Sequence, residues 1–427
     1  MKDPFANVKA LAPVKNRGAR EARGFVLEAP AGSGMLAQAL GAAVKRNRYG
    51  EHLSLKRWFS EPDAAEMRAE AIRLIAPKAP REAYDATQWL FLDTETTGVC
   101  GGTGTYAFLV GVAWWEAAGL ETEQFFMRDH NEEHSVLLAL SERLAERRVL
   151  VTFNGKSFDW PLLETRYRMT RCIEPRAPEA HLDLLHPARH LWRLRLGSVR
   201  LTELERHVLG LDRGEDVPGE LIPQAYFDFL NGADPSLLTA VFRHNQWDLR
   251  SLAALACRML SLLAQTSATT LDSRELYGMS RLLDRRGERA RARKLYAKAL
   301  HSGLPRDAER LAQHRLASLA KRERDFGAAN ALWEELRGTS REGMQAWEEL
   351  AIYYEHHAGM PERAAELVQE ALNELRKAYR ARLLAQNAFT HWQNRFRKRL
   401  ERLGRKLNRA SLRLSASESR GTARESN

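Results

Sequence analysis

The segment Asp93-Thr-Glu-Thr-Thr-Gly98 directly follows a short apolar run, Gln88–Leu92, which we expect to form a strand. Alternate residues of a strand point to the same face, so Asp93 and Glu95 would present two carboxylates side by side. Carboxylates in that arrangement repel each other unless a cation holds them, and hard oxygen ligands suit Mg²⁺ or Mn²⁺. The following residues, Thr96–Gly98, allow a tight turn and a close approach to a substrate.

Two later segments carry further acids. Asp159 ends the segment Asn154-Gly-Lys-Ser-Phe-Asp159, and Asp248 ends His244-Asn-Gln-Trp-Asp248, ahead of an apolar helical run. His244 and Asp248 are four residues apart, which places them on one helical face. Each acid alone is a weak signal, because an isolated Asp is usually solvated. Together, the four acids from three distant segments could hold two cations ~3.5–4 Å apart and catalyse phosphodiester hydrolysis.

The surrounding pattern predicts an α/β domain with a mixed central sheet over residues 86–265. Strands alternate with helices, which is typical of that class. After Pro187 the chain is largely helical to about residue 265. The expected strands are Gln88–Leu92, Ala107–Trp115, Glu123–Met127, Val149–Phe153 and Ala180–Asp183, and the expected helices span 132–147 and 160–170.

These motifs resemble a known superfamily. Asp93-Thr-Glu-Thr-Thr-Gly98 matches the first exonuclease motif of the DEDD (DnaQ-like) superfamily of the ribonuclease-H fold. Asn154-x-x-x-Phe-Asp159-x-Pro resembles the second motif, in the form seen in proofreading domains of B-family DNA polymerases, and His244-x-x-x-Asp248 stands where the third belongs. More narrowly, Gly98–Gly111, Asp216-Val-Pro-Gly219 and His244-Asn resemble the YprB ribonuclease-H-like family.

The resemblance implies roles for the acids and for His244. Asp93, Glu95, Asp159 and Asp248 would be the ligands of two divalent cations, Mg²⁺ or Mn²⁺, and His244 would be the general base. The spacing departs from the superfamily pattern, because the histidine subclass places its His five residues before the last Asp, where this chain has Arg243. One residue turns a helix by ~100°. The alternatives for His244 are therefore to orient the water, to contact the phosphate, or to bond the backbone.

Other residues are weaker candidates. Asp183 either supports the site or caps a helix. Phe158, Trp160 and Tyr106 could stack on bases or belong to the core. Asn154 either contacts the substrate or closes its turn, and Lys156 is either a phosphate contact or a solvated loop lysine. The expected substrate contacts are Asn154, Lys156, Thr96 and Gly98.

A helical repeat is predicted over residues 270–375. The segments Gly287–Leu300 and Gly359–Leu372 align with Gly, Ala, Leu and Ala-Leu in register, and a segment ending Ala328–Leu336 fits between them, giving a period of 36. Small and aromatic residues at this spacing allow paired helices to nest, and the pattern resembles the tetratricopeptide repeat. A plain helical bundle is the alternative. The partner of such an array would be another protein.

Charge separates the C-terminal part from the rest. Residues 376–427 hold 15 Lys/Arg and 3 Asp/Glu, whereas the whole chain has a net charge of +11. Charge this polarised usually marks a segment that meets a polyanion. We expect a basic amphipathic helix, with Phe396, Leu400, Leu403 and Leu407 on one face, followed by a disordered tail from residue 411. Residues 1–85 are expected to be a partly disordered N-terminal extension.

Two functions from different classes fit these features. The first is a metal-dependent 3′–5′ exonuclease acting on single-stranded or frayed nucleic acid, DNA or RNA. The second is a nucleic-acid-binding adaptor with a weakened nuclease site, docking a protein through its repeats; endonuclease cutting is a third possibility. The three cysteines form neither a disulfide framework nor a zinc site, and no run approaches the ~20 apolar residues of a bilayer span. We expect a cytoplasmic protein with no membrane partner.

Overall fold

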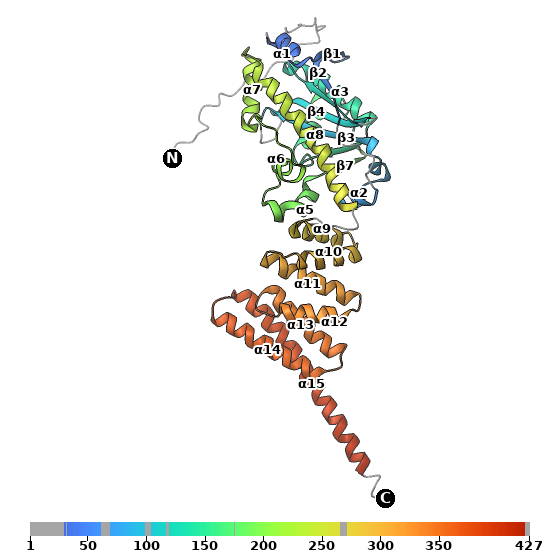
Figure 1. Ribbon diagram of the computed structural model, residues 1–427, viewed down its shortest axis with the longest axis vertical. Helices are drawn as coiled ribbons and strands as arrows, with labels where there is room; N and C mark the ends of the chain where they lie inside the picture. Colours follow the sequence, from blue (N-terminus) through green and yellow to red (C-terminus); the bar gives the residue numbers. More distant parts are fainter. Residues whose placement is uncertain are drawn as a thin grey trace, which may run out of the picture.

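The structure, a computed structural model, describes residues 30, 32–60, 69–98, 104–116, 119–174, 176–264 and 271–422. Its first part is an α/β unit built on one sheet, and its second part is a stack of helices that extends away from one end of that unit (Figure 1). The predicted combination of a mixed-sheet α/β domain with a C-terminal helical region is confirmed.

The sheet has seven strands in the order β1-β2-β5-β4-β3-β6-β7. The β1 to β5 side is antiparallel, whereas β6 and β7 run parallel to β3. The carboxyl ends of β3, β6 and β7 therefore meet at one edge. The strands are β1 (Ala43–Asn47), β2 (Gly50–Phe59), β3 (Trp89–Thr96), β4 (Ala107–Glu116), β5 (Gly119–Phe126), β6 (Val149–Thr152) and β7 (Ala180–Asp183).

The sheet begins before the predicted domain boundary. β2 pairs with β5 along Leu53–Phe59, and β1 pairs in turn with β2, so residue 86 does not mark an edge of the sheet. Residues 43–59 belong to the α/β unit rather than to an extension of it, because Leu53 and Leu55 are buried in its core. Residues 1–29, part of the expected disordered stretch, lie outside the described residues, and residues 33–40 form a helix.

Helices cover both faces of the sheet. Two buried clusters result: one joins Trp89, Phe91 and Val151 to the C-terminal half of α8, and the other joins Leu90, Leu92 and Leu150 to α3 and α4. The helices are α1 (Ser33–Leu40), α2 (Ala69–Ile75), α3 (Glu133–Glu146), α4 (Asp159–Thr170), α5 (Leu185–Leu196), α6 (Leu201–Leu204), α7 (Ile222–Leu230) and α8 (Ser236–Ala264). Short turns are η2 (Arg81–Tyr84), η3 (Ala86–Gln88), η4 (His130–Glu132), η5 (Glu205–Leu209) and η6 (Gly219–Leu221).

Gly111 allows α8 to approach the sheet. It lies in β4, directly across from Asp93 on β3 and Gln124 on β5. A Cβ atom at this position would lie 2.1 Å from Oδ1 of Asn245 and 2.9 Å from a methyl carbon of Leu249, both on α8. The absent side chain therefore sets the distance between this helix and the strands that carry the acids.

The C-terminal helices dock on the α/β unit through α9. Gly278 of α9 lies so close to α5 that a Cβ atom there would be 2.5 Å from the carbonyl oxygen of His190. Glu275 of α9 accepts hydrogen bonds from the Trp192 indole at 3.0 Å and from Arg195 at 2.5 Å. The core of the sheet continues without a break into α9–α11. These helices are α9 (Ser273–Arg285), α10 (Arg289–His301), α11 (Arg306–Arg322), α12 (Phe326–Leu336), α13 (Arg341–His356), α14 (Pro361–Arg380) and α15 (Gln386–Thr422).

Consecutive helices α9 to α14 pack in pairs, with a left-handed residue in the turn of each pair. Gly287, Arg324 and Gly359 have φ values of 86°, 61° and 67°. The small residue that lets the second helix nest is Ala292, Ala329 or Ala364, each with no exposed surface. The middle unit is thus shifted by one residue from the sequence alignment, which used the half-buried Ala328.

The expectation of a disordered tail from residue 411 is wrong for residues 411–422, which continue α15. Extending an existing helix avoids the cost of nucleation, and this segment contains no proline. Nearer its start, α15 packs on α13 and α14 through Trp392, Phe396 and Leu403. Residues 423–427 lie outside the described residues.

No helix within the described residues is both long enough and apolar enough to cross a bilayer.

Replacing Gly111 by Ala should destabilise the α/β unit by about 1–3 kcal/mol, because the added methyl group overpacks the contact with Asn245. Urea denaturation of the full chain measures this change. Gly34→Ala is the matched control, since a Cβ atom at Gly34 has nothing within 4 Å. Equal stability of the two variants would contradict the role given to Gly111.

A buried histidine should make stability depend on pH. Burial lowers the pKa of His52 on β2 to about 4. Between that value and the unfolded value near 6.5, the unfolded chain binds a proton that the native protein does not. His52 should therefore reduce stability as the pH falls from about 6.5 to 4, by up to about 3 kcal/mol.

The measurement compares unfolding free energies of the native sequence and His52→Gln across this range. Subtraction removes the effect of other titrating groups, including His181, whose pKa burial also lowers to about 4. Parallel pH profiles for the two proteins would refute the assignment to His52.

Candidate metal and catalytic site

Asp93 and Glu95 occupy the carboxyl end of β3, on the sheet face that meets α8. Asn245 of α8 donates a hydrogen bond from Nδ2 to Oδ2 of Asp93 at 2.8 Å. Its own Oδ1 accepts a bond from Gln124 Nε2, also at 2.8 Å. This buried amide thus links three strands to the helix and fixes the rotamer of Asp93.

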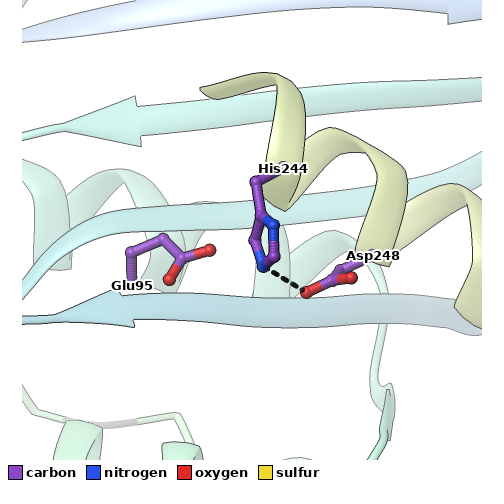
Figure 2. Close-up of side chains that lie close together, drawn as sticks. All are labelled: Glu95, His244 and Asp248. Atoms are coloured by element: carbon purple, nitrogen blue, oxygen red, sulfur yellow. Dashed lines mark ion pairs between the residues drawn. The ribbon is translucent and has the colours of Figure 1, made fainter. Parts of the chain in front are cut away.

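His244 and Asp248 lie one turn apart on α8 and meet Glu95. One ligand atom from each of the three side chains lies within 4.8 Å of the other two. In Figure 2 the imidazole of His244 lies between the two carboxylates, and its Nε2 is 3.5 Å from Oδ2 of Asp248. These residues come from two segments about 150 positions apart in the chain.

Asp159 is the first residue of α4. Its Oδ1 accepts a hydrogen bond of 2.5 Å from the hydroxyl of Thr94, the residue between the two β3 acids. Asp159 is therefore tied to the same end of β3, although it belongs to a helix on the other face of the sheet. Asp93 and Asp159 are not part of the tight Glu95–His244–Asp248 group.

Burial raises the pKa values of all four acids, and the charges of neighbouring acids add to this at Asp93 and Glu95. Burial raises the pKa of Asp93 well above its usual range; the charges of Asp248, Glu95 and Asp159 raise it further, and the Asn245 hydrogen bond opposes them. Burial and the charges of Asp248 and Asp159 raise the pKa of Glu95 to about 8. Burial likewise raises the pKa values of Asp159 and Asp248. Such a cluster favours either protons or a bound cation.

Arg213 supplies a counter-charge within the protein. Its guanidinium is bonded to Asp248, to Glu205 at 2.6 Å and to Asp216 at 3.1 Å. Asp216 in turn lies 2.8 Å from Nδ1 of His244. Burial raises the pKa of Asp216, but the bonds from His244 and Arg213 outweigh burial and leave it lowered. Asp216 is thus a carboxylate that holds the ring with Nε2 toward the acids.

The loop before Asp159 is held by Asp183 at the end of β7. Oδ1 of Asp183 accepts hydrogen bonds from the backbone N–H groups of Asn154 at 2.9 Å and Leu185 at 3.0 Å. Oδ2 accepts one from Lys156 at 3.2 Å. Asp183 therefore holds the loop and also bonds the first residue of α5, although the N-cap position of that helix is Leu184. Asn154 closes the turn with a φ of 70°.

The remaining candidates are divided between surface and core. Lys156 and Phe158 are exposed, the latter by 58%, whereas Trp160 is only 9% exposed. Tyr106 lies beneath Arg166, whose guanidinium carbon is 3.8 Å from the ring centroid. Thr96 donates a hydrogen bond to the carbonyl oxygen of Gly98 at 2.8 Å, so it braces the turn after β3.

Three residues of the site are not among the sequence candidates: Asn245, Arg213 and Asp216. Asn245 falls at a core position of α8 between Phe242 and Leu249, so a polar residue on an apolar helical face was the available signal. Asp216 is the first residue of the Asp216–Gly219 motif that resembles the YprB family, but the motif did not indicate a function for it. Arg213 has a local partner in Asp216, but its contact with the proposed ligand Asp248 joins positions 35 residues apart, which no local pattern reveals.

Comparisons with known proteins agree with this architecture. Residues 90–260 match the model of an RNase H superfamily family. An uncharacterized protein, YprB, from Bacillus subtilis is 33% identical over 298 residues, which cover 69% of this chain and 71% of the relative. A family B DNA polymerase from Pyrobaculum calidifontis aligns at 18% identity with a TM-score of 0.35, covering 47% of this chain and 29% of the polymerase chain. The chain therefore belongs to the YprB family, with an RNase H superfamily domain at its centre.

Proposed function

We propose that this protein is a metal-dependent 3′–5′ exonuclease that hydrolyses phosphodiester bonds at single-stranded or frayed ends of nucleic acid. The observation that carries the proposal is the meeting of Glu95, His244 and Asp248 beside Asp93 and Asp159. Membership of the RNase H superfamily supports a nuclease in general. The exonuclease polarity rests on the order and form of the three motifs.

The side chains fit divalent cations. Asp93, Glu95, Asp159 and Asp248 offer hard oxygen donors, and burial raises their pKa values, so a bound cation would stabilise their charged forms. We assign these four residues as ligands of two ions, Mg²⁺ or Mn²⁺. Bound divalent cations neutralise phosphate charge and ease deprotonation of the attacking water.

His244 is assigned as the base. Asp216 holds Nδ1, which leaves Nε2 facing the acids. In the reaction Nε2 accepts a proton from water, and the hydroxide attacks the terminal phosphorus. The bond from phosphorus to the 3′ oxygen of the preceding nucleotide breaks, which releases a nucleoside 5′-monophosphate. The leaving 3′ oxygen takes a proton from solvent and becomes the 3′ hydroxyl of the shortened strand, and His244 returns its proton to solvent. The contact between Asp216 and Nδ1 of His244 would orient the ring toward the acids even though His244 is four, not five, residues before Asp248.

The loop of residues 154–158, which precedes Asp159 and is called the catalytic loop below, carries side chains that could bind the 3′ end of a nucleic-acid strand. Phe158, next to Asp159, is exposed and can stack on a base, and Lys156 can contact a phosphate. Asn154 and the Thr96–Gly98 turn complete the proposed substrate contacts. Stacking and charge would bind a frayed end without regard to sequence.

The helical region is assigned two binding roles. Its three helix pairs resemble tetratricopeptide units and would dock a protein partner. On α15, Arg395, Arg399 and Arg402 pair with Glu348 and Glu355 of α13, so part of the basic charge is neutralised within the array. Arg397, Lys398 and Arg405 are exposed on α15 and would contact nucleic acid.

An adaptor with a weakened nuclease is the second candidate. It is favoured by the bond between Arg213 and Asp248, because an internal cation then competes for a proposed metal ligand. Nuclease assays separate the two functions.

Removing any one proposed ligand should abolish cleavage. Asp93→Asn, Glu95→Gln and Asp248→Asn each remove a charge that holds cations, so we expect at least about a 100-fold loss, corresponding to about 3 kcal/mol. The assay follows 3′ shortening of 5′-labelled single-stranded DNA and RNA in Mg²⁺ or Mn²⁺, with EDTA as the metal-free reference.

Asp307→Asn is the matched control, since this exposed acid on α11 lies far along the chain from the site. It should cut at the native rate. Binding without cleavage by the native protein under both metals would overturn the exonuclease and favour the adaptor. Internal cuts without 3′ shortening would favour an endonuclease.

Asp216→Asn should slow the reaction by about 10–100-fold, as loss of an orienting partner does in other metal sites. Rates at saturating substrate measure this effect. An unchanged rate would remove Asp216 from the role of orienting His244.

A further inference from the structure

A cavity lies beside the catalytic loop. Its volume is about 400 Å³, and its lining comes from β7, the segment after α2, the start of α5 and the end of α9. Lys156 contributes to its wall from the catalytic loop. The cavity therefore joins the α/β unit, the N-terminal segment and the first C-terminal helix at one place.

Part of the cavity lining, called the floor below, is apolar. It comprises Ile75, Ala79, Leu182 and Pro187, and His181 lies beside them in the lining. His181 lies 2.8 Å from the hydroxyl of Thr152, and burial lowers its pKa to about 4, so the ring is neutral near pH 7. Flat, uncharged surroundings of this kind suit the face of a heterocyclic ring.

The rim carries positive charge that the protein does not neutralise. Among the described residues, the side chains of Lys78 and Lys156 have no hydrogen-bond or ion-pair partner, and Arg286 donates only to the carbonyl oxygen of Leu74, at 2.7 Å. The two acids of the wall are already used: Glu179 pairs with Arg148, and Asp183 accepts three backbone N–H groups.

We propose that this cavity is a nucleotide-binding subsite, with the base on the apolar floor and its phosphate between Lys78, Lys156 and Arg286. The inference rests on the proposed nuclease function, because it places a nucleotide of the bound strand next to the catalytic loop. The same chemistry is presented by a free nucleoside monophosphate, which is the product of that reaction.

The subsite is connected to the catalytic loop through Asp183. This carboxylate lies in the cavity wall and also accepts hydrogen bonds from the backbone N–H groups of Asn154 and Lys156. Lys156 is three residues before Asp159. A phosphate bound by Lys156 would thus fix the loop that presents Asp159. A nucleotide in the cavity is expected to favour the ordered form of that loop.

Two variants and one control test the subsite, and none of these substitutions changes a proposed catalytic residue. Lys78→Glu combined with Arg286→Glu reverses the charge of the rim, and Ala79→Trp fills the floor with no change of charge. Arg289→Glu is the matched control, because this exposed arginine begins α10 outside the cavity. Each is made in full-length protein carrying Asp93→Asn, so that bound strands are not cut, and thermal unfolding verifies folding.

The first measurement is anisotropy with fluorescein-labelled deoxy and ribo 12-mers. We expect the double charge variant and Ala79→Trp each to weaken binding of at least one 12-mer by about tenfold, with native-like affinity for Arg289→Glu. The dependence of affinity on salt should fall by about two phosphate contacts in the double variant. The second measurement is calorimetric titration with thymidine and adenosine 5′-monophosphates, which detects the free-nucleotide source.

Loss of 12-mer binding alone assigns the cavity to the substrate strand, and loss of monophosphate binding alone assigns it to the free nucleotide. Unchanged affinity for all four ligands in both the double variant and Ala79→Trp would overturn the subsite. Cleavage by the native chain is scored separately: a subsite that binds in a protein without nuclease activity refutes the exonuclease alone. Cleavage with unchanged binding in the variants refutes the subsite alone.

Discussion

The close contact between α8 and the sheet at Gly111 is the constraint on which the site depends. The missing side chain leaves room for Asn245, whose amide joins Gln124 on β5 to Asp93 on β3. Because α8 is a single helix of 29 residues, fixing it at Asn245 also fixes His244 one residue earlier and Asp248 three residues later. The neutral, buried amide of Asn245 thus holds the carboxylates close together despite their mutual repulsion.

Part of that repulsion is offset by a positive charge within the protein. Arg213 pairs with Glu205, Asp216 and Asp248 at once. Its charge lowers the pKa values of Asp248 and Glu95, but burial outweighs it, and the pKa values of all four proposed ligands stay raised. The protein therefore neutralises the acids only in part, which is the pattern expected where mobile cations complete a site.

The sequence predicted the parts of the site that follow a local period. The two-residue repeat of a strand gave the Asp93 and Glu95 pair, and the four-residue spacing of a helix gave His244 and Asp248. Residues whose role depends on distant segments were not predictable: Arg213 acts through a loop whose path no periodicity reveals. The sequence assigned β1 and β2 to an extension for the same reason, since the pairing of β2 with β5 spans more than 60 residues and β1 joins the sheet only through β2. Composition predicted disorder from residue 411 because it considers the segment alone. Residues 411–422 instead continue α15, which has already formed before them.

The helical region is part of the same mechanical unit as the site. Its first helix shares a continuous core with the sheet and meets α5 at Gly278, where backbone contacts backbone. Asp183 accepts a hydrogen bond from the first residue of α5 and also holds the loop that leads to Asp159. A displacement of α9 against α5 would therefore have a short route to a proposed metal ligand. The proposed nucleotide at the end of α9 would act on this same connection.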